Sequence, residues 1–191
     1  MYFQTDYRDV VLVSSKYERE LKGVLQGEEE VLRRYGRSLP PEERSKLDGV
    51  RRSPFLVIRA AGSLGFDLVA LRSGVAFPLE VKASRADTIR FSSASGRAAQ
   101  QLIAHRAAVD RVGLMVVYAY RRIGERHESW RVYTASAGPL NGKAELIRKR
   151  LPRVQETRSG NGVLRWSEGK SLAAFLEELH FLISPFVAAP A

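Results

Sequence analysis

The apolar residues between positions 15 and 25 recur at the spacing of an α-helix. They predict a helix with one buried stripe, formed by Tyr17, Leu21, Val24 and Leu25. Ser14 or Ser15 could cap this helix, and Glu18 would then complete a capping box with Ser15. Glu18 therefore has a purely structural interpretation beside any chemical one. The preceding segment 7–13 is predicted to form a short strand or an ordered arm.

Two further segments show helical patterns. The segment 96–111 is expected to form a helix that ends before Gly113, and its inward positions would be Ala98, Leu102, Ile103 and Val109. The pattern near the C-terminal end predicts an amphipathic helix. Its apolar positions are Leu172, Phe175, Leu176, Leu179, Leu182 and Ile183. This helix is expected to cover either the central sheet or another subunit.

Short runs rich in β-branched residues separate these helices, and they predict strands. The runs are 55–58, 66–71, 76–82, 114–118 and 128–134. The run 114–118 is apolar throughout, which is typical of a central strand that is covered on both faces. Between two of the runs, Ser73 and Gly74 predict a two-residue hairpin turn.

Two polar stretches that contain several Gly, Pro and Arg residues interrupt this pattern. Residues 27–53 are expected to form an inserted loop that contains a short helix through 28–35. Residues 135–162 have a similar composition, and a short helix is expected there at 144–149. Both stretches lie outside the hydrophobic pattern that defines the core.

The chain contains no internal repeat and no linker that would separate two domains. We therefore expect a single domain over residues 1–191, which is an ordinary size for one domain. Its core would span about 14–134, and a C-terminal extension over 135–191 would end in the amphipathic helix. The predicted fold class is α/β, with a mixed central β-sheet flanked by helices.

The charge of the chain indicates a polyanionic partner. Its 191 residues include 24 Arg and 7 Lys against 21 acidic residues, which gives a formal net charge of +10. Arginine presents a planar fork of donors that matches phosphate oxygens. Four basic clusters could follow a DNA backbone or could equally be ordinary solvated surface: 33–34, 51–52, 121–122 and 148–150.

The composition also excludes several classes of protein. The absence of cysteine excludes disulfides, thiol catalysis and zinc–cysteine sites. No apolar run approaches the roughly 18 residues of a membrane span, no secretory signal pattern is present, and no nucleotide-binding glycine motif occurs. We expect a cytoplasmic protein that meets DNA and uses neither a membrane nor a nucleotide cofactor.

The candidate chemistry lies in the predicted hairpin. If Ser73 and Gly74 form the turn, Asp67 falls opposite Glu80, and such partners have Cβ atoms roughly 4.5–5.5 Å apart. Lys82 lies two residues after Glu80 and therefore points to the same face of the strand. Two adjacent carboxylates repel each other unless a cation intervenes. Pro78 indicates that one side of this strand lacks a ladder partner there.

Oxygen ligands of this kind suit Mg²⁺, and Mn²⁺ could substitute for it. A bound divalent ion activates water and stabilises charge on a scissile phosphate. Lys82 could orient that water, deprotonate it or bind the phosphate, and the sequence does not choose among these roles. The alternative is that Glu80 and Lys82 form an exposed ion pair on a solvated strand face.

Two other kinds of polar residue could contribute to the site. Gln100 and Gln101, at the start of the helix expected after the hairpin, could reach the metal or a phosphate, although at least one of them should be plain surface. His105, His127 and His180 show no metal-ligand spacing with one another. We expect these histidines to be structural or exposed.

The sequence resembles the archaeal Holliday junction resolvases, which belong to the PD-(D/E)XK nuclease superfamily. Three stretches carry the resemblance in the family's order: Tyr17-Glu18-Arg19-Glu20-Leu21, Val57 to Ser63 with Asp67 to Ala70, and Leu79-Glu80-Val81-Lys82. Fainter similarity continues to the last helix. The chain departs from the family in the segment 27–53, where the family has a short connection, and in its greater length.

The resemblance implies a restriction-endonuclease-like fold and a set of site residues. The implied metal ligands are Glu18, Asp67 and Glu80, and Lys82 completes the catalytic set. The positions that the family uses for phosphate and junction contacts correspond to Arg19, Arg59 and Ser63. Family members act as homodimers that cut two opposing strands symmetrically.

The sequence therefore predicts a Mg²⁺-dependent, homodimeric endonuclease that resolves four-way DNA junctions. One alternative is a nuclease of the same superfamily that acts on another DNA substrate, such as a duplex, a flap or a restriction site. A second alternative is a DNA-binding module without catalytic activity. Junction specificity would depend on dimer geometry and surface shape.

Overall fold

A mixed six-stranded sheet forms the centre of the computed structural model, which describes residues 7–60, 65–92, 97–136 and 138–183. The strand order is β1-β2-β3-β5-β6-β9, and only β3 and β5 pair in parallel. The strands are β1 (Leu56–Arg59), β2 (Leu68–Arg72), β3 (Val75–Ser84), β5 (Val117–Arg122), β6 (Trp130–Thr134) and β9 (Lys170–Ser171). The predicted mixed central sheet is confirmed.

A second, three-stranded sheet lies beside the first and was not predicted. It consists of β4 (Thr88–Phe91), β8 (Gly162–Arg165) and β7 (Gln155–Glu156), paired antiparallel in that order. Its strands have two to four residues, which is too short for an alternating pattern to be recognised in sequence. Phe91 and Leu164 from this sheet are fully buried against the central sheet, so it extends the core.

The hairpin between β2 and β3 has the predicted turn and register. Ser73 and Gly74 both have positive φ, 39° and 77°, as a two-residue hairpin turn requires. The pairing runs from Arg72 opposite Val75 to Leu68 opposite Leu79. Pro78 pairs within this ladder, but β5 pairs with β3 only from Leu79 onward, so its missing N–H costs no bond to β5.

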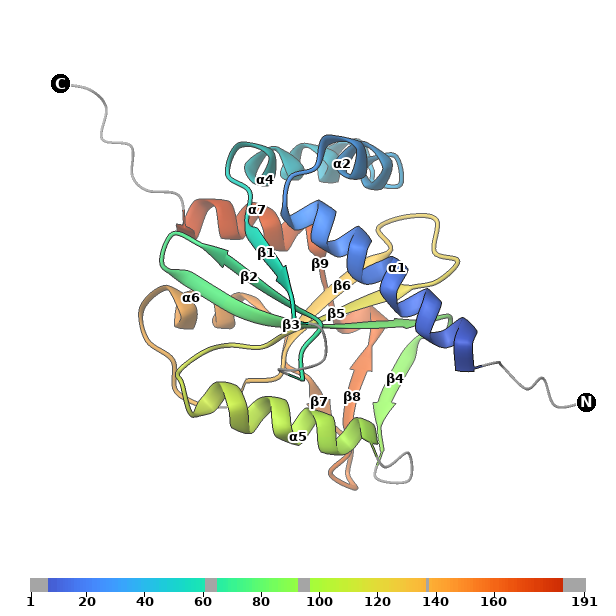
Figure 1. The fold of residues 1–191 in the computed structure, drawn as a ribbon, viewed down its shortest axis with the longest axis vertical. Helices are drawn as coiled ribbons and strands as arrows, with labels where there is room; N and C mark the ends of the chain where they lie inside the picture. The colour runs from blue at the N-terminus through green and yellow to red at the C-terminus, as the bar shows by residue number, and fades with distance from the viewer. Residues whose placement is uncertain (1–6, 61–64, 93–96, 137, 184–191) are drawn as a thin grey trace, which may run out of the picture.

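Helices cover both faces of the sheet (Figure 1). α1 (Tyr7–Leu25) and α7 (Leu172–Ile183) pack on one face, together with α6 (Gly142–Arg150), which contacts α7. α5 (Arg97–Asp110) packs on the other face. Successive side chains of β5 point to opposite faces of the sheet, each of which has its own hydrophobic core. Val117 and Ala119 face α1 and α7, whereas Tyr118 and Tyr120 face α5. The chain thus has the predicted α/β architecture of a sheet flanked by helices.

The beginning of α1 corrects two expectations. Segment 7–13 is the first part of this helix and forms neither a strand nor an arm. A nucleated helix adds each further residue at low cost, whereas an isolated strand has no ladder partner. Ser14 and Ser15 consequently lie inside the helix and cannot cap it, so the interpretation of Glu18 as a capping-box residue is wrong.

The inserted segment is helical, and the expectation of a loop over 27–53 is wrong. It contains α2 (Glu29–Gly36), α3 (Pro41–Arg44), a 3₁₀ turn η1 (Ser45–Leu47) and α4 (Asp48–Arg52). The short helix expected at 28–35 corresponds to α2. Pro41 is the first residue of α3, a helix position that tolerates proline well. In the sequence alone, a proline here favours a loop. The segment buries Leu32, Tyr35, Leu39, Leu47 and Val50.

The last predicted helix is confirmed as α7, and it covers the sheet of its own chain. The short helix expected at 144–149 is present as α6. In α5 the buried side chains are Leu102, His105 and Val109, whereas the expected inner residue Ile103 is 65 % exposed. Ile103 follows Leu102 by a single residue, which turns it about 100° away from the buried stripe. No helix in the described ranges is long and apolar enough to cross a membrane.

Candidate active site

Glu80 and Lys82 share one face of β3, as the strand periodicity predicted. Glu80 is only 2 % exposed, and its Oε1 accepts a hydrogen bond of 2.7 Å from the Lys82 ammonium. The neighbouring Leu79 and Val81 point to the opposite face and join the core under α1. The expectation of an exposed ion pair does not fit Glu80, because its carboxylate is buried. Burying a carboxylate is costly unless it is paired.

Asp67 reaches the same region from the residue just before β2. Its backbone N–H donates to the Leu79 carbonyl (3.1 Å), and its Oδ2 accepts the Val81 N–H (2.7 Å). The regular β2–β3 pairing ends at Leu68 and Leu79, so Asp67 does not form the expected direct cross-strand pair with Glu80. Its carboxylate instead bonds to the backbone next to Glu80.

The two carboxyl groups interact electrostatically. Burial, and secondly the charge of Glu80, raise the pKa of Asp67 to about 6, whereas the Val81 N–H and Lys82 oppose this shift. Burial also raises the pKa of Glu80, opposed by Lys82 and by Gln101. Both shifts indicate a site whose negative charge is incompletely compensated by protein groups. A bound cation would relieve that cost.

Gln101 on α5 holds the two charged groups of β3 together. Its Oε1 accepts a bond of 2.9 Å from the Lys82 ammonium, and its Nε2 donates to Glu80 Oε1 at 2.9 Å. With the Lys82–Glu80 bond this closes a triangle of three interactions. Of the two glutamines considered, Gln101 is therefore the one that reaches the site, and Gln100 is exposed.

His105 lies one helical turn beyond Gln101 and is buried next to Glu80. Its Nε2 is 2.5 Å from the Gly65 carbonyl and 4.0 Å from Glu80 Oε2. A carbonyl only accepts, so Nε2 carries the proton and Nδ1 accepts the Tyr118 hydroxyl at 2.8 Å. Burial lowers the pKa of His105, which favours this neutral form. The Phe66 ring stacks on the imidazole at 4.3 Å.

His105 is buried, as a structural histidine would be, but the sequence did not predict that it lies beside Glu80. The spacing of four residues between Gln101 and His105 was the available signal, because residues i and i+4 share one helix face. The sequence predicted Tyr118 only as part of a central strand. In the structure its hydroxyl donates to His105 Nδ1 and holds the imidazole in its orientation. Burial raises the pKa of this hydroxyl and keeps it protonated.

Glu18 lies on α1, which covers the face of the sheet opposite to α5. It is 8 % exposed, and its Oε2 accepts a bond of 2.7 Å from Arg59 Nη2 at the end of β1. Its charge also contributes to the raised pKa values of Asp67 and Glu80. The structure therefore brings Glu18 and Arg59 together as an ion pair at the edge of the carboxylate site.

Of the remaining two residues expected to bind DNA, the structure places one. Arg19 is exposed on α1 and lines a groove between α1 and α2, next to Lys16 and Arg34. Ser63 falls outside the described residues. Arg59, with a side chain that is 47 % exposed, is thus the expected DNA contact that lies beside the carboxylates.

The donor set at Asp67 and Glu80 fits Mg²⁺. Among the described residues, no three His, Asp or Glu side chains converge as a preformed metal centre. Mg²⁺, however, commonly takes one or two carboxylates and completes its shell with water and substrate phosphate. Glu80 Oε2 is buried and makes no hydrogen bond within the described part of the chain, so it is an unused acceptor beside Asp67. Such an orphaned oxygen calls for a partner.

No protein-family model matches the chain, and no curated protein matches its sequence. Among solved structures, the chain is similar to a Holliday junction resolvase from the archaeal hyperthermophile Archaeoglobus fulgidus. The identity is 19 %, the TM-score is 0.43, and the alignment covers 70 % of this chain and 91 % of the other. A likeness at this level supports no assignment of activity.

Proposed function

We propose that this protein is a Mg²⁺-dependent DNA endonuclease. The observation that supports this most directly is the pair of carboxylates at Asp67 and Glu80 with the Lys82 ammonium beside them. Glu80 is buried and Asp67 is half-buried, and Glu80 Oε2 has no hydrogen bond from the described residues. Together with a net charge of +10, these groups suit hydrolysis of a phosphodiester in a polyanion.

Asp67 and Glu80 would hold the ion, and Glu18 would be a third ligand. When bound, Mg²⁺ would stabilise the charge that develops on the scissile phosphate and favour ionisation of the attacking water. Glu18 is paired with Arg59, so the two residues act together. If Arg59 turns to a DNA phosphate, its ion pair with Glu18 opens at the edge of the site.

Lys82 would act as a hydrogen-bond donor to the substrate. An ammonium has three N–H donors, of which Lys82 uses one toward Glu80 and one toward Gln101. The third N–H remains for a phosphate oxygen or for the attacking water. Because Lys82 already donates both of these bonds, a role as a donor suits it better than removal of a proton from water.

The finer proposal concerns the substrate. We infer that the enzyme resolves four-way DNA junctions as a homodimer, and this rests on the three sequence stretches around Glu18, Asp67 and Glu80. A junction offers two equivalent strands, and a two-fold dimer would present two equivalent sites to them. The inserted helices have no counterpart in the resemblance, so the junction preference needs its own test.

The experiment compares an immobile four-way junction with a linear duplex of the same sequence, each with Mg²⁺ or EDTA. Paired symmetric cuts in the junction alone support the resolvase. Cuts in both substrates leave a nuclease of broader specificity and remove the junction proposal. Binding without cleavage in Mg²⁺ leaves only a DNA-binding module.

Three variants assign any cleavage to the site. Asp67→Asn and Glu80→Gln should each abolish cleavage, because each removes a charge from the proposed ligand pair. Glu42→Gln is the matched control, since Glu42 is exposed on α3 and far from the hairpin in sequence. Cleavage that survives in Asp67→Asn and Glu80→Gln would remove this site from the mechanism.

A further inference from the structure

We propose that the inserted helix α2 and helix α1 form a groove that binds the phosphate backbone of duplex DNA. The α1–α2 groove is defined by Lys16 and Arg19 on α1, Arg34 and Tyr35 on α2, and Arg121 and Ser129 at the ends of β5 and β6. This inference deepens the proposed function, because it assigns to that enzyme a substrate-binding surface separate from the carboxylates.

The groove lies between helices on the surface and has a volume of about 620 Å³. Its lining residues come from the helices α1 and α2 and from the turn after β5. A groove bounded by helices on a surface admits an extended polymer more readily than a small enclosed ligand.

The cations of the groove are available, whereas most of its carboxylates are engaged. Within the described residues, Lys16, Arg19 and Arg34 are exposed and form no ion pair. Glu20 is bound by Arg121 and by the Trp130 indole N–H. Its charge is therefore already compensated.

Two further carboxylates border the groove. Glu125 accepts the backbone N–H groups of Arg126 and His127 and pairs with Arg122. Glu28 is exposed on the rim and opposes the cations in part. Three uncompensated cations against one exposed carboxylate leave a positive groove, which favours an anionic polymer.

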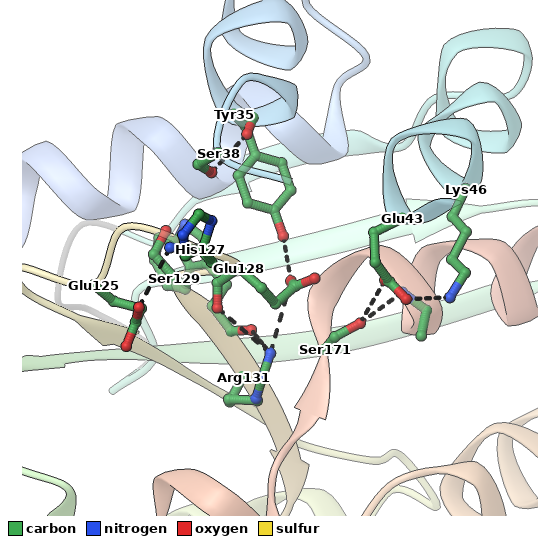
Figure 2. A network of polar contacts seen from close by, with 12 residues as sticks. Tyr35, Ser38, Glu43, Lys46, Glu125, His127, Glu128, Ser129, Arg131 and Ser171 are labelled. Carbon is green, nitrogen blue, oxygen red and sulfur yellow. Dashed lines mark hydrogen bonds and ion pairs between the residues drawn. The ribbon is translucent and has the colours of Figure 1, made fainter. Parts of the chain in front are cut away.

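The insertion is fixed in place, so the groove is preformed. Figure 2 shows Tyr35 of α2 directed at Glu128, and the tyrosine hydroxyl donates to Glu128 Oε1 at 2.7 Å. The Glu128 N–H also donates to the Ser38 carbonyl (3.2 Å). Ser171 of β9 donates to Glu43, which pairs with Lys46. These buried and partly buried bonds anchor α2 and α3 to the sheet, so binding needs little reordering.

The positive surface continues over the outer side of α2. Arg33 and Arg37 are exposed there, and with Arg34 and Glu30 they line a smaller hollow of about 150 Å³. Within the described residues Arg33 and Arg37 form no ion pair, so α2 and the residue that follows it present three unpaired arginines around one hollow. Arginine suits bidentate contact with phosphate.

The groove and the carboxylate site share α1. Glu18 faces Arg59 on one side of this helix, whereas Lys16 and Arg19 line the groove on another. A helix with its side chains is about 10–12 Å wide. One strand of B-DNA covers that width in about three or four nucleotides, at 3.4 Å each. One duplex arm could therefore contact the groove and the carboxylates together.

The test measures equilibrium binding of a fluorescein-labelled linear DNA duplex in EDTA, where cleavage plays no part. The groove variant is Lys16→Gln with Arg34→Gln, which leaves the carboxylate site intact. The control is Arg111→Gln with Arg158→Gln, since both arginines are exposed, lie outside the groove and the four basic clusters, and lower the net charge equally. Circular dichroism of each variant verifies folding.

We expect the groove variant to bind roughly tenfold more weakly and the control to bind like the wild type. The slope of log K against log salt should fall by about 2 in the groove variant, one for each lost phosphate contact. Equal affinity and slope in the groove variant and the wild type would overturn the inference. An equal loss in the control would do the same, because it would reduce the effect to net charge.

A single-stranded RNA of the same length provides the second arm. Tighter binding of this RNA than of the duplex, with dependence on Lys16 and Arg34, would overturn the assignment to duplex DNA. The outcome for the groove is separable from the outcome for cleavage. Groove-dependent DNA binding in a protein that never cuts would support the groove and remove the nuclease, and normal binding by the groove variant of an active nuclease would do the reverse.

Discussion

The Asp67 carboxylate accepts the backbone N–H of Val81 at 2.7 Å, at the point where regular pairing between β2 and β3 ends. This bond fixes the carboxylate to the strand that carries Glu80 and Lys82, independently of any metal. It also explains why the carboxyl groups stay close despite their mutual repulsion. The backbone of β3 compensates part of the Asp67 charge.

Asp67→Asn should stabilise the metal-free protein at neutral pH. The pKa of Asp67 is about 6 in the folded state, against 3.8 ordinarily, so its contribution to stability is present below pH 3.8 and is lost as the pH rises through 6. After allowance for screening we expect Asp67→Asn to gain about 1–2 kcal/mol at pH 7.5 in EDTA and almost nothing near pH 3.5. Urea unfolding at both pH values checks this, and a gain that is independent of pH would contradict it.

Mg²⁺ should stabilise the wild type through the same carboxylates. A free ion at 100 times its Kd adds about 2.7 kcal/mol, or roughly 5–10 °C in Tm for a chain of this size. Glu80→Gln should lose this shift and Glu42→Gln should keep it. The wild-type shift should also fade below pH 6, where protons compete for Asp67. An undiminished shift in Glu80→Gln would place the ion elsewhere.

His105→Ala should be strongly destabilising. It leaves the Gly65 carbonyl and the Tyr118 hydroxyl without their partner and removes the ring that stacks on Phe66. A buried polar group without its partner costs about 1–3 kcal/mol, and the lost packing adds to this, so we expect a loss of roughly 2–4 kcal/mol. Tyr118→Phe, which removes a single hydroxyl, should cost about 1 kcal/mol. Thermal or chemical unfolding that ranks these two variants in the opposite order would refute the arrangement.

Glu128→Gln should become progressively more favourable as the pH rises. Burial raises the pKa of Glu128, so its contribution to stability is present at low pH and is lost as the pH rises through the folded value. Glutamine keeps an acceptor for Tyr35 but has no charge to desolvate. The stability difference between variant and wild type should therefore move toward the variant from about pH 4 to about pH 8. Tyr35→Phe should do the opposite, since it removes the donor to the charged group.

The hairpin at the site was predictable because local rules determine it. Ser73 and Gly74 specify the turn, the turn specifies the register, and the period of two places Glu80 and Lys82 on one face. The displacement of Asp67 from a direct pair was not predictable, since it depends on a side-chain bond to the Val81 backbone. No residue pattern encodes that bond.

The elements that sequence reasoning missed depend on tertiary packing. The inserted helices have at most eight residues each, so none shows a full amphipathic pattern, and their stability comes from anchors such as Tyr35 and Leu47. The small sheet β4–β8–β7 forms between segments about seventy residues apart. The metal and DNA contacts of Glu18 and Arg19 remain predictions, because they depend on a ligand.

Because β3 and β5 pair in parallel, the residues of the site are expected to come together in two steps during folding. Asp67, Glu80 and Lys82 belong to one hairpin, and such local pairing forms in microseconds. Gln101, His105 and Tyr118 arrive only when the crossover through α5 docks β5 on β3. Closing that long loop is the slower event. Substitutions in the hairpin turn should therefore slow folding, whereas those in α5 should chiefly speed unfolding, and stopped-flow kinetics measures both. During folding, Asp67, Glu80 and Lys82 would thus be together briefly before Gln101 of α5 bonds to the Lys82 ammonium.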